Sequence, residues 1–404
     1  MILFIALMGY LVYFTAVRAR RVVNSPYNQR QDAFAERVVR GDIVDRSGNV
    51  LATTDVAEDG TETRSYPYGS VFAHVVGYSD KDLGTTGLES VENFELLTSN
   101  AFFMEKLQNE FSGSKNIGDT VVTTLDADLQ QAAYNALGDN KGAVVVMEAD
   151  TGKILSMVSK PDYDPNYIVS DWSTLNTDEE NSPLLNRATQ GSYAPGSTFK
   201  IVTTLAFMRQ NADYANYTYD CIGEITTGDT TIHCFGGTAH GYEDLRSSIA
   251  NSCNSSFAHI GTLLDISGYR DTAEALLFNK ELPSVLGYTK SSFALTEDSP
   301  EAEVMMTAMG QGKTTVSPYH MALITQAIAN DGVLMEPYLV DSVTNYTGTE
   351  IRRNVPKSYK RLMTTDEAAQ LREYMTAVVE EGTGSVLSGS SYTAAGKTGT
   401  AEYS

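Results

Sequence analysis

The chain has few of the residues on which many enzyme sites depend. Its 404 residues include 3 cysteines, 5 histidines and 1 tryptophan. No G-x-S-x-G sequence occurs, so the histidines have no nucleophile elbow with which to form a Ser-His-Asp site. No internal repeat or low-complexity tract is present. The sequence therefore favours neither an α/β-hydrolase site nor a repeat architecture.

Positive charge is also scarce. The chain has 51 acidic residues against 29 lysines and arginines, which gives a net charge of −22. The basic residues form no patch outside Arg18 to Arg21, which argues against nucleic acid as a partner. We interpret the acidity as a contribution to solubility. A hydrophobic content of 42% at this length is enough for two to three domains with buried cores.

The sequence gives little support to a metal site. His233, Cys234 and His240 form a lone His-Cys-x5-His pattern without the paired spacing of zinc sites, so we expect no metal and no bound cofactor. Cys221 and Cys234 could form a disulfide outside the cell, worth up to ~3 kcal/mol, and the sequence leaves this open. Cys253 is expected to be a small packed residue.

Three short motifs carry the main functional signal. They are Ser197-x-x-Lys200, Ser252-x-Asn254 and Lys397-Thr398-Gly399. Each motif alone is weak, but the three in this order are typical of a serine acyl-transfer site. The first motif would supply the nucleophile and its base.

A second Ser-x-x-Lys pattern, Ser112 to Lys115, lies in a polar stretch that we expect to be a loop. Ser197 instead opens a predicted helix, in which the spacing of i and i+3 brings its hydroxyl close to the Lys200 amine. The apolar face of this helix would be Phe199, Val202, Leu205 and Ala206. Burial, or Lys397 as a second cation, would lower the pKa of Lys200 so that it could act as a base.

The second motif falls at a predicted break between two helices. The apolar residues that indicate these helices are Leu245 and Ile249, then Phe257, Ile260 and Leu264. A break here can project Ser252 and Asn254 into a cleft. Serine and asparagine are also common helix caps, which is the alternative interpretation.

Other elements can be predicted from local patterns. We expect a helix over residues 127–137, a hairpin over 142–159 with its turn at 150–152, and a helix over 317–330. A further helix would begin with a capping box between Thr364 and Glu367 and stop at Gly382. Residues 391–403 read as a strand with Lys397 and Gly399 on one side and Thr398 and Thr400 on the other.

Along nearly its whole length the chain resembles the penicillin-binding proteins, in particular the monofunctional class B transpeptidases. Besides the three motifs, the similar segments are RGDIVDRSGNVLA (40–52), GTTGLE (84–89), DPN (164–166), LLNRATQGSYAPGSTFK (184–200), HGYEDLRSSIANSCNSSF (240–257) and GQGKTTVSPYHMA (310–322). The resemblance implies an α+β fold: a membrane anchor at 1–17, a mostly β pedestal at 18–135, and a serine β-lactamase/transpeptidase-like domain at 136–404, with an antiparallel sheet flanked by helices.

The resemblance also implies the reaction, cross-linking of peptidoglycan stem peptides through a serine acyl-enzyme that β-lactams also form. Ser197 would attack the bond between two terminal D-alanines, Ser252 would carry protons, and Asn254 would orient the substrate amide. The backbone N–H groups of Ser197 and Thr400 would hold the oxyanion, on the order of 3 kcal/mol per donor. Lys397, Thr398, Gly399 and Thr400 would recognise the terminal carboxylate. The implied partners are stem peptides, β-lactams and a membrane glycosyltransferase.

Residues 1–17 carry no charge and approach the ~20 residues that span a bilayer. We expect a single-pass anchor in the bacterial membrane, with the catalytic domain on the extracytoplasmic side. A cleaved signal peptide is less well supported because no basic segment precedes the apolar run. The basic residues follow the run, opposite to the positive-inside rule, so we expect upstream residues to be missing. The C-terminal end likewise looks clipped.

Two alternatives of other classes remain open from the sequence. A serine β-lactamase or penicillin sensor of the same fold shares the three motifs and differs in the fate of the acyl-enzyme. A non-catalytic wall-assembly scaffold would use the pedestal to bind partners. The intact catalytic positions argue against the scaffold, and the long pedestal and anchor argue against the β-lactamase.

Overall fold

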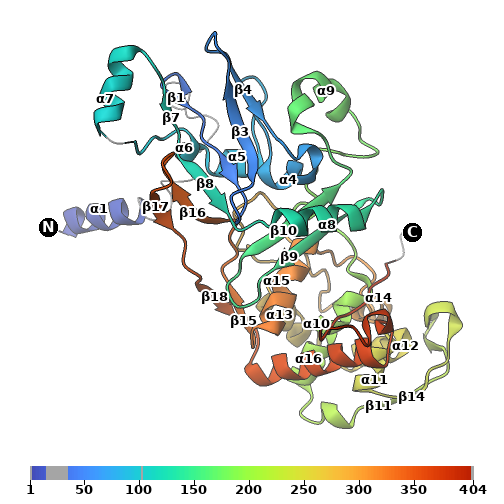
Figure 1. Ribbon diagram of the computed structural model, residues 1–404. Helices are drawn as coiled ribbons and strands as arrows, with labels where there is room; N and C mark the ends of the chain where they lie inside the picture. The colour runs from blue at the N-terminus through green and yellow to red at the C-terminus, as the bar shows by residue number, and fades with distance from the viewer. Residues whose placement is uncertain (1, 15–34, 102, 402–404) are drawn as a thin grey trace.

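A computed structural model describes residues 2–14, 35–101 and 103–401. The fold is α+β, with a region rich in strands at the top of Figure 1 and a region rich in helices below it. Residues 15–34, which include Arg18 to Arg21, the end of the predicted anchor and the start of the predicted pedestal, lie outside the described residues. Residues 402 and 403 of the predicted last strand do so as well.

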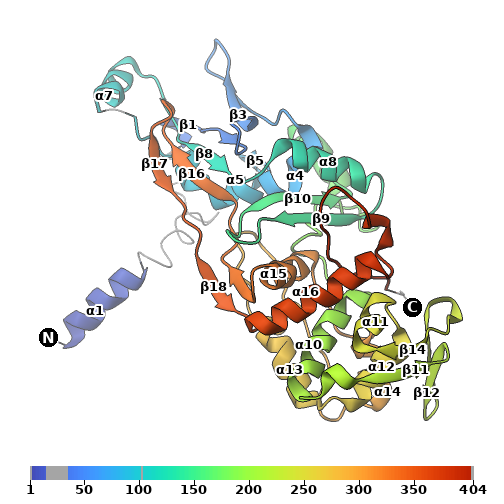
Figure 2. The same cartoon turned by 60° about the horizontal axis from the view of Figure 1, so that its bottom comes forward.

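A six-stranded sheet forms the centre of the upper region. Its strand order is β17 (Glu350–Arg353), β16 (Val340–Thr344), β8 (Thr120–Thr123), β2 (Ile43–Val44), β3 (Val50–Val56) and β4 (Glu62–Ser65). Strands β2 and β8 are parallel, and their other neighbours are antiparallel. Figures 1 and 2 show the red-brown β16 and β17 beside the cyan β8, so the chain returns to the pedestal sheet late in its course.

Short elements surround this sheet. They are β1 (Val38–Val39), β5 (Ser79–Asp80), β6 (Gly84–Thr85), β7 (Asn116–Ile117), α4 (Ala73–Val76), α5 (Gly87–Val91), α6 (Asn93–Leu96) and α7 (Phe103–Ser112). Two of the similar segments meet here, because the Arg40 guanidinium lies 2.6 Å from the Glu89 carboxylate. Arg64 binds the other oxygen of Glu89 at 2.7 Å. The buried Glu89 of α5 thereby ties β4, through Arg64, to the segment between β1 and β2, through Arg40.

The predicted hairpin is confirmed as β9 (Gly142–Met147) and β10 (Ile154–Lys160), which pair antiparallel. Helix α8 (Ala127–Leu137) packs against β10, and α15 (Pro318–Ala329) packs against β9. Both helices were predicted, and each begins at a polar cap: the Asp126 side chain accepts from the Leu129 N–H and the Ser317 side chain from the His320 N–H. Helices therefore flank this two-stranded antiparallel hairpin.

The remaining helices gather below the hairpin (Figure 2). They are α10 (Lys200–Gln210), α11 (Leu245–Ala250), α12 (Asn254–Leu263), α13 (Ile266–Ala275), α14 (Glu301–Ala308) and α16 (Thr365–Glu380). Helix α9 (Ile168–Leu175) lies apart from them, in the upper region of Figure 1. The capping box of Thr364 and Glu367 is confirmed at the start of α16. Strands β15 (Val333–Met335) and β18 (Ser358–Arg361) lie between the two regions.

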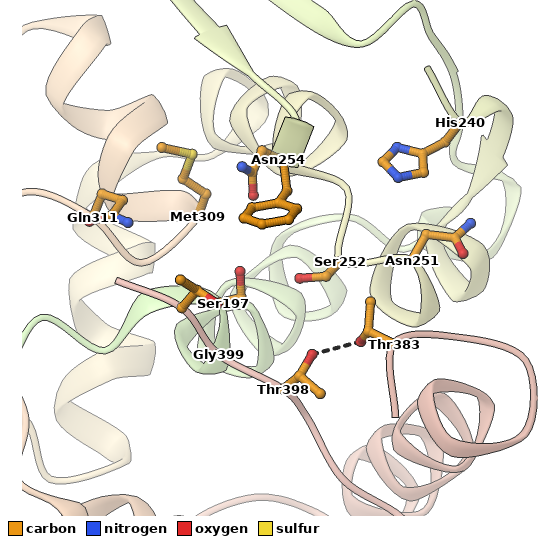
Figure 3. Close-up of a pocket in the computed structure, with 12 residues that line it drawn as sticks. Ser197, His240, Asn251, Ser252, Asn254, Met309, Gln311, Thr383, Thr398 and Gly399 are labelled. Carbon is orange, nitrogen blue, oxygen red and sulfur yellow. Dashed lines mark hydrogen bonds between the residues drawn. The ribbon is translucent and has the colours of Figure 1, made fainter. Parts of the chain in front are cut away.

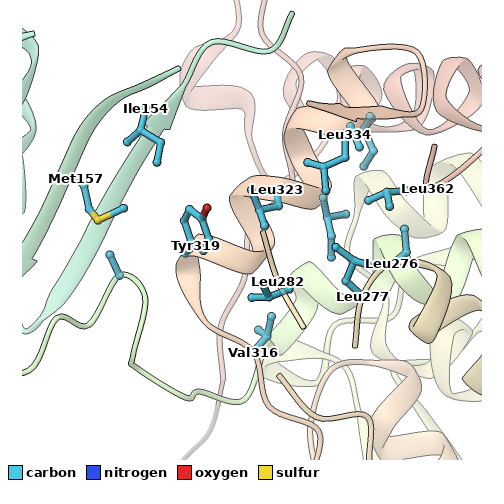
Figure 4. Close-up of a cluster of buried hydrophobic side chains, with 14 of the residues drawn as sticks. Ile154, Met157, Leu276, Leu277, Leu282, Val316, Tyr319, Leu323, Leu334 and Leu362 are labelled. Carbon is cyan, nitrogen blue, oxygen red and sulfur yellow. The ribbon is translucent and has the colours of Figure 1, made fainter. Parts of the chain in front are cut away.

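One hydrophobic core joins the hairpin to these helices. Tyr319 of α15 is 1% exposed and lies between Ile154 and Met157 of β10 and the leucines of the helical region (Figure 4). Its hydroxyl donates to the Pro283 carbonyl at 2.7 Å, so the buried polar atom of this side chain is satisfied. The hairpin and the helices therefore behave as one packed unit.

The N-terminal helix α1 (Ile2–Tyr13) has 12 residues with mostly exposed apolar side chains, among them Leu3 and Phe4. Over the described ranges, the structure contains no helix with both the length and the apolar character needed to cross a membrane.

Two local predictions were wrong. Residues 391–401 do not form a strand, because a strand needs a neighbour to pair with and the backbone bond that holds this segment runs from the Gly396 N–H to the Met375 carbonyl of α16. Ser112 does not lie in a loop but is the last residue of α7. Lys115 follows it in a loop and pairs with Glu62 at 2.8 Å, away from the Ser112 hydroxyl, which bonds Asn109 and Ser114.

Candidate active site

A cleft between the helical region and the last part of the chain brings the three motifs together (Figure 3). Its lining residues are Ser197, Phe235, His240, Asn251, Ser252, Asn254, Met309, Gln311, Thr383, Thr398, Gly399 and Thr400. Figure 3 shows Gln311 and Met309 at one end, His240 at the other, and Ser197 and Ser252 between them. Every predicted site residue lies in the cleft lining or, for Lys200 and Lys397, contacts it by hydrogen bonds.

Ser197 lies in a 3-10 turn, η4 (Gly196–Phe199), that leads directly into α10. The turn approaches another loop closely, since a Cβ on Gly310 would lie 1.7 Å from the Gly196 carbonyl oxygen. Gly196 and Gly310 both have positive φ, and the Gly196 N–H donates to the Gly310 carbonyl at 2.9 Å. Glycine is therefore required at both positions to place the nucleophile. The predicted apolar face of α10 is confirmed, with its four residues at 4% exposure or less.

Lys200 is fully buried and lies within reach of four oxygen atoms. Its Nζ is 3.1 Å from Ser197 Oγ, 2.7 Å from the Ser252 carbonyl oxygen, 3.2 Å from Ser252 Oγ and 2.8 Å from Asn254 Oδ1. The two carbonyl-type oxygens can only accept, so they take both N–H groups of a neutral amine. The amine lone pair then remains for a hydroxyl, either that of Ser197 or that of Ser252.

The electrostatics of the cleft favour this neutral amine. Burial lowers the pKa of Lys200 well below its usual value, and the positive charge of Lys397 lowers it further. Burial also lowers the pKa of Lys397, to about 8, so that this second lysine still carries charge at neutral pH. The sequence predicted that burial and the charge of Lys397 would each lower the pKa of Lys200, and both effects have this direction in the structure.

The Ser-x-Asn motif lies at the break between α11 and α12, as predicted. Ser252 has a φ of 53°, a left-handed conformation that is uncommon for a non-glycine residue. Its hydroxyl accepts from Lys397 Nζ at 2.8 Å. Asn254 Nδ2 donates to the His233 carbonyl at 3.0 Å, so both ends of this amide are engaged within the protein. Cys253 between them is fully buried, as expected for a packed residue.

The Lys-Thr-Gly segment lies against the nucleophile turn without forming a strand. A Cβ on Gly399 would lie 2.8 Å from Thr198 Cγ2, and a Cβ on Gly196 would lie 2.5 Å from the Thr400 carbonyl oxygen. The sequence predicted Lys397 on one side of this segment and Thr398 and Thr400 on the other. This alternation is not seen, because Thr398 and Thr400 line the cleft and Lys397 also contacts it, by its hydrogen bond to Ser252. The segment is thus positioned by close backbone contact.

Sequence reasoning missed several cleft residues. Thr383 Oγ1 is 2.6 Å from Thr398 Oγ1, the contact drawn in Figure 3, although Thr383 belongs to no motif. Gly382 is needed beside it because a Cβ there would lie 2.0 Å from the Ala250 carbonyl oxygen. Asn251 and Gln311 lie within the similar segments 240–257 and 310–322, which could have marked them.

The three cysteines are free thiols, so the disulfide that the sequence left open between Cys221 and Cys234 is not formed. The sulfur atoms of Cys221 and Cys234 are 3.7 Å apart. Together with Cys253 and His240 they form a group whose four ligand atoms all lie within 4.8 Å of one another. The sequence pattern weighed for a metal included His233, whose ring instead points to Glu224 at 3.1 Å.

Comparison with known proteins places these features in a family. Residues 142–404 match the family described as the penicillin binding protein transpeptidase domain. Residues 40–121 match the penicillin binding protein A dimerisation domain. The peptidoglycan D,D-transpeptidase PbpA of Mycolicibacterium smegmatis is 32% identical over 428 residues, an alignment that covers 100% of this chain and 85% of the relative.

Solved structures give the same result. The D,D-transpeptidase domain of a peptidoglycan glycosyltransferase from Eggerthella lenta superposes with a TM-score of 0.82 at 34% identity, covering 91% of this chain and 88% of the other. The imipenem acyl-enzyme complex of penicillin-binding protein A from M. tuberculosis has a TM-score of 0.77 at 30% identity, covering 85% and 82%. The resemblance inferred from the sequence is confirmed, and the chain belongs to the family of penicillin-binding protein transpeptidases.

Proposed function

We propose that the cleft carries out D,D-transpeptidation of peptidoglycan with Ser197 as the nucleophile and Lys200 as its base. The observation that carries this assignment is the position of Lys200 Nζ, 3.1 Å from Ser197 Oγ, with its N–H groups taken up by Ser252 and Asn254. The activity itself is that of the family: the M. smegmatis relative is a peptidoglycan D,D-transpeptidase, and penicillin-binding protein A of M. tuberculosis forms an acyl-enzyme with imipenem.

In the first half-reaction, Ser197 Oγ attacks the carbonyl carbon between the two terminal D-alanines of a stem peptide. Its proton passes to the lone pair of Lys200, and the developing oxyanion is held by the backbone N–H groups of Ser197 and Thr400. The Ser197 N–H lies in the first turn of a helix, where it has no intrahelical acceptor and adds to the positive end of the dipole. Collapse of the intermediate breaks the C–N bond and leaves the stem peptide on Ser197.

The leaving D-alanine needs a proton, and Ser252 is placed to deliver it. Its hydroxyl lies 3.2 Å from Lys200 Nζ and 2.8 Å from Lys397 Nζ, so a proton can pass from Lys200 through Ser252 to the departing amine. Asn254 fixes the other side of Lys200 and lines the cleft where the substrate amide would bind.

The substrate carboxylate would bind at the Lys-Thr-Gly segment. Lys397 supplies the positive charge, and the hydroxyls of Thr398 and Thr400 supply hydrogen bonds. Because Gly399 has no side chain, the Lys-Thr-Gly backbone can lie close to the turn that carries Ser197. Thr383 holds the Thr398 hydroxyl at 2.6 Å and so would orient it toward the carboxylate.

In the second half-reaction an amine of a neighbouring stem peptide attacks the acyl-enzyme, loses its proton and releases Ser197. β-Lactams would acylate Ser197 as well; the M. tuberculosis relative forms an acyl-enzyme complex with imipenem. Hydrolysis by a β-lactamase would need a group that activates water. Among the described residues that line the cleft there is no Asp or Glu, which favours a long-lived acyl-enzyme.

The location of the enzyme is also a proposal. Residues 1–17 would anchor the chain in the bacterial membrane, with residues 35–401 on the extracytoplasmic side where peptidoglycan lies. Leu3 and Phe4 on α1 are 85% and 67% exposed, which fits a helix that a lipid environment covers. A membrane glycosyltransferase that makes the glycan strands would be the partner. Membrane fractionation of cells, with and without residues 1–17, tests the anchor.

Acylation and turnover together test the function. Purified protein is incubated with a fluorescent penicillin and followed by intact mass spectrometry, beside Ser197→Ala and the matched control Ser112→Ala from the second Ser-x-x-Lys pattern. Wild type and Ser112→Ala should carry one stable label, and Ser197→Ala none. A stem pentapeptide with an acceptor amine should then release one D-alanine per cross-link formed.

Other results would overturn the proposal in identifiable ways. Rapid release of hydrolysed penicillin would indicate a β-lactamase, and stable labelling without cross-linking would indicate a sensor. No label on any form would indicate a non-catalytic scaffold. Loss of label in Ser112→Ala alone would contradict the motif assignment.

A further inference from the structure

A carboxyl group that the mechanism above does not use is buried behind the wall of the catalytic cleft. Glu243 lies in β14 (Gly241–Asp244), which pairs with β11 (Thr218–Cys221), and it is 1% exposed. One of its oxygens, Oε1, accepts a hydrogen bond from Asn251 Nδ2 at 2.8 Å. The other oxygen, Oε2, is buried and has no hydrogen-bond partner among the described residues.

The fold itself gives no reason for this buried side chain. A buried polar atom without a partner lowers stability, so such atoms are rare in native proteins and need an explanation. The strand uses only the backbone of Glu243, which pairs opposite Tyr219. Helix α11 is capped by the next residue, Asp244, whose side chain accepts from the Ser247 N–H. The side chain of Glu243 therefore serves its one partner, Asn251.

Glu243 determines which way the amide of Asn251 faces. An ionised carboxylate can only accept hydrogen bonds, and an acid proton on Oε2 would have no acceptor in the part of the chain that the structure describes, so the contact is made by the Asn251 nitrogen. Asn251 is half-buried and lines the cleft. Its Oδ1 accepts no hydrogen bond from any described residue. The cleft therefore has, at this point, a fixed hydrogen-bond acceptor without a donor.

Asn251 lies on the side of the cleft where the terminal carboxylate of the stem peptide would bind. The Thr383 N–H donates to the carbonyl of Ala250, the residue before Asn251, at 3.0 Å. The Thr383 hydroxyl contacts that of Thr398 in the Lys-Thr-Gly segment. Figure 3 shows Asn251 beside Thr383 and away from Gln311. Asn251 is therefore next to the place that the terminal D-alanine vacates when it leaves.

We propose that Asn251, oriented by Glu243, binds the acceptor amine as it enters the place vacated by D-alanine. An alkyl amine has a pKa of about 10, so the acceptor arrives as an ammonium group, and both its charged and its neutral form carry N–H groups for Oδ1. The ammonium of Lys397 suits an anion instead. Asn251 is thus a binding residue and Glu243 a positioning residue. The inference rests on the proposed transpeptidation, since only that reaction uses an amine.

From this position the amine passes to the acyl-enzyme. It gives one proton to water and becomes neutral, and its nitrogen then attacks the carbonyl carbon of the acyl group on Ser197. The N–C bond forms and the C–O bond to Ser197 breaks. The second proton passes through Ser252, the residue next to Asn251, to Lys200, which returns a proton to Ser197 Oγ. The products are the cross-linked peptide and the free serine hydroxyl.

The fate of the acyl-enzyme tests the proposal. An ester analogue of the donor stem peptide acylates the protein, and the acyl-enzyme then divides between water and an added amine, Nα-acetyl-L-lysine amide, with both products measured by mass spectrometry. The variant is Glu243→Met, which removes both oxygens and keeps the length of the side chain. Its matched control is Asp220→Asn, which alters an exposed carboxylate of the neighbouring strand β11. The penicillin acylation rate of each protein is measured as the reference.

In Glu243→Met the amide of Asn251 can turn either way. The amine concentration for half-maximal aminolysis should therefore rise about three- to tenfold, as expected for one hydrogen bond, with the maximal rate nearly unchanged. The melting temperature should not fall, because an apolar side chain replaces a buried carboxylate that has an unpaired oxygen. Asp220→Asn should match wild type in both measurements. A lower melting temperature with an unchanged dependence on amine would show a purely structural role and overturn the proposal.

A double variant, Glu243→Gln with Asn251→Asp, tests the direction of the hydrogen bond. The new carboxylate at position 251 can only accept, so the amide at position 243 must donate to it, and an oxygen again faces the cleft at the same net charge. This protein should use the amine at least as well as wild type. Amine use as poor as that of Glu243→Met would overturn the proposal. A wild-type protein that forms no acyl-enzyme would instead overturn the proposed function, and this inference with it.

Discussion

Lys200 and Lys397 share one hydroxyl group, with their Nζ atoms 3.2 and 2.8 Å from Ser252 Oγ. Two ammonium groups so close together repel, and burial adds to the cost of charging them. Lys200, which is the more deeply buried, therefore gives up its proton more readily, and Lys397 keeps its charge to a pH of about 8. One lysine is left as a base and the other as a binding site for an anion.

The pH dependence of acylation should show both lysines. Burial and the charge of Lys397 lower the pKa of Lys200 well below its usual value, so its amine becomes protonated, and acylation slows, as the pH falls through that lowered value. The pKa of Lys397 is about 8, so the anion site loses its charge above this pH and the rate falls about tenfold per unit. The second-order rate constant for penicillin acylation, measured from pH 5 to 10, should give a bell-shaped profile.

The alkaline limb can be assigned with Lys397→Arg, because arginine stays charged throughout this range. The limb near pH 8 should disappear in this variant even if the maximal rate is lower. Lys141→Arg, which alters an exposed lysine elsewhere, should leave the profile unchanged. An identical alkaline limb in Lys397→Arg and wild type would contradict the assignment.

Removal of the base should affect the chemical step more than the fold. Lys200→Met keeps the length of the side chain and removes the amine, so Ser197 has no proton acceptor at 3.1 Å. We expect acylation to slow by about 10²–10⁴-fold, the usual contribution of a positioned base. Stopped-flow measurement of penicillin acylation separates the acylation rate from initial affinity. An unchanged rate would show that another group takes the serine proton.

The approach of two loops at Gly310 offers a matched pair of variants. Gly310 and Gly312 have φ values of +92° and +87°, so alanine at either position carries similar backbone strain. A Cβ on Gly310 would lie 1.7 Å from the Gly196 carbonyl oxygen, whereas one on Gly312 would have its nearest neighbour at 3.7 Å. Only Gly310→Ala should therefore displace the turn that carries Ser197.

We expect Gly310→Ala to lower the acylation rate at least about 100-fold, as misplacement of a catalytic group by about 1 Å can do, and Gly312→Ala to stay within a fewfold of wild type. Circular dichroism and thermal melting of both variants check that the fold persists. Equal rates in the two variants would show that the close contact does not position the nucleophile.

Local patterns could predict much of this molecule because the signals for single elements lie within a few residues. The capping box at Thr364 and the apolar face after Ser197 are examples, and both are confirmed. The three motifs could also be assigned to one site, because their order resembles that of a known family. Helix breaks and caps are local properties of the chain.

Features that depend on distant pairing were not predictable in this way. Strand β16 joins the pedestal sheet by pairing with β8, more than 200 residues earlier, and β17 pairs with β16 in turn; no local pattern indicates such a partner for β16. Residues 391–401 have the alternation of a strand, yet they bind α16 through Gly396 instead. The group of Cys221, Cys234, His240 and Cys253 is likewise assembled from separate segments of the fold, so no short sequence pattern predicts it.

The buried carboxylate of Glu89 makes a last prediction about stability. It binds Arg40 at 2.6 Å and Arg64 at 2.7 Å, and its side chain is 0% exposed. Glu89→Gln would leave two buried guanidinium groups without a counter-charge, so we expect a loss of about 3–5 kcal/mol in the free energy of unfolding. Glu62→Gln, which removes the partly exposed pair between Glu62 of β4 and Lys115, should cost less than about 1 kcal/mol. Urea denaturation measures both values.

The same carboxylate should also determine part of the response to acid. Burial by itself raises the pKa of Glu89, but the charges and hydrogen bonds of Arg40 and Arg64 outweigh it, and the pKa is lowered below its usual value. A lowered pKa in the folded state means that the contribution of Glu89 is complete above the pKa of the unfolded chain, near 4.5, and is lost as the pH falls through the folded value. The difference in unfolding free energy between wild type and Glu89→Gln should therefore be constant from pH 8 to pH 6 and shrink below about pH 4.5. A difference that stays constant into acid would show that the pKa of Glu89 is not lowered by folding, and one that grows as the pH falls from 8 towards 4.5 would show that Glu89 is a neutral acid in the folded protein.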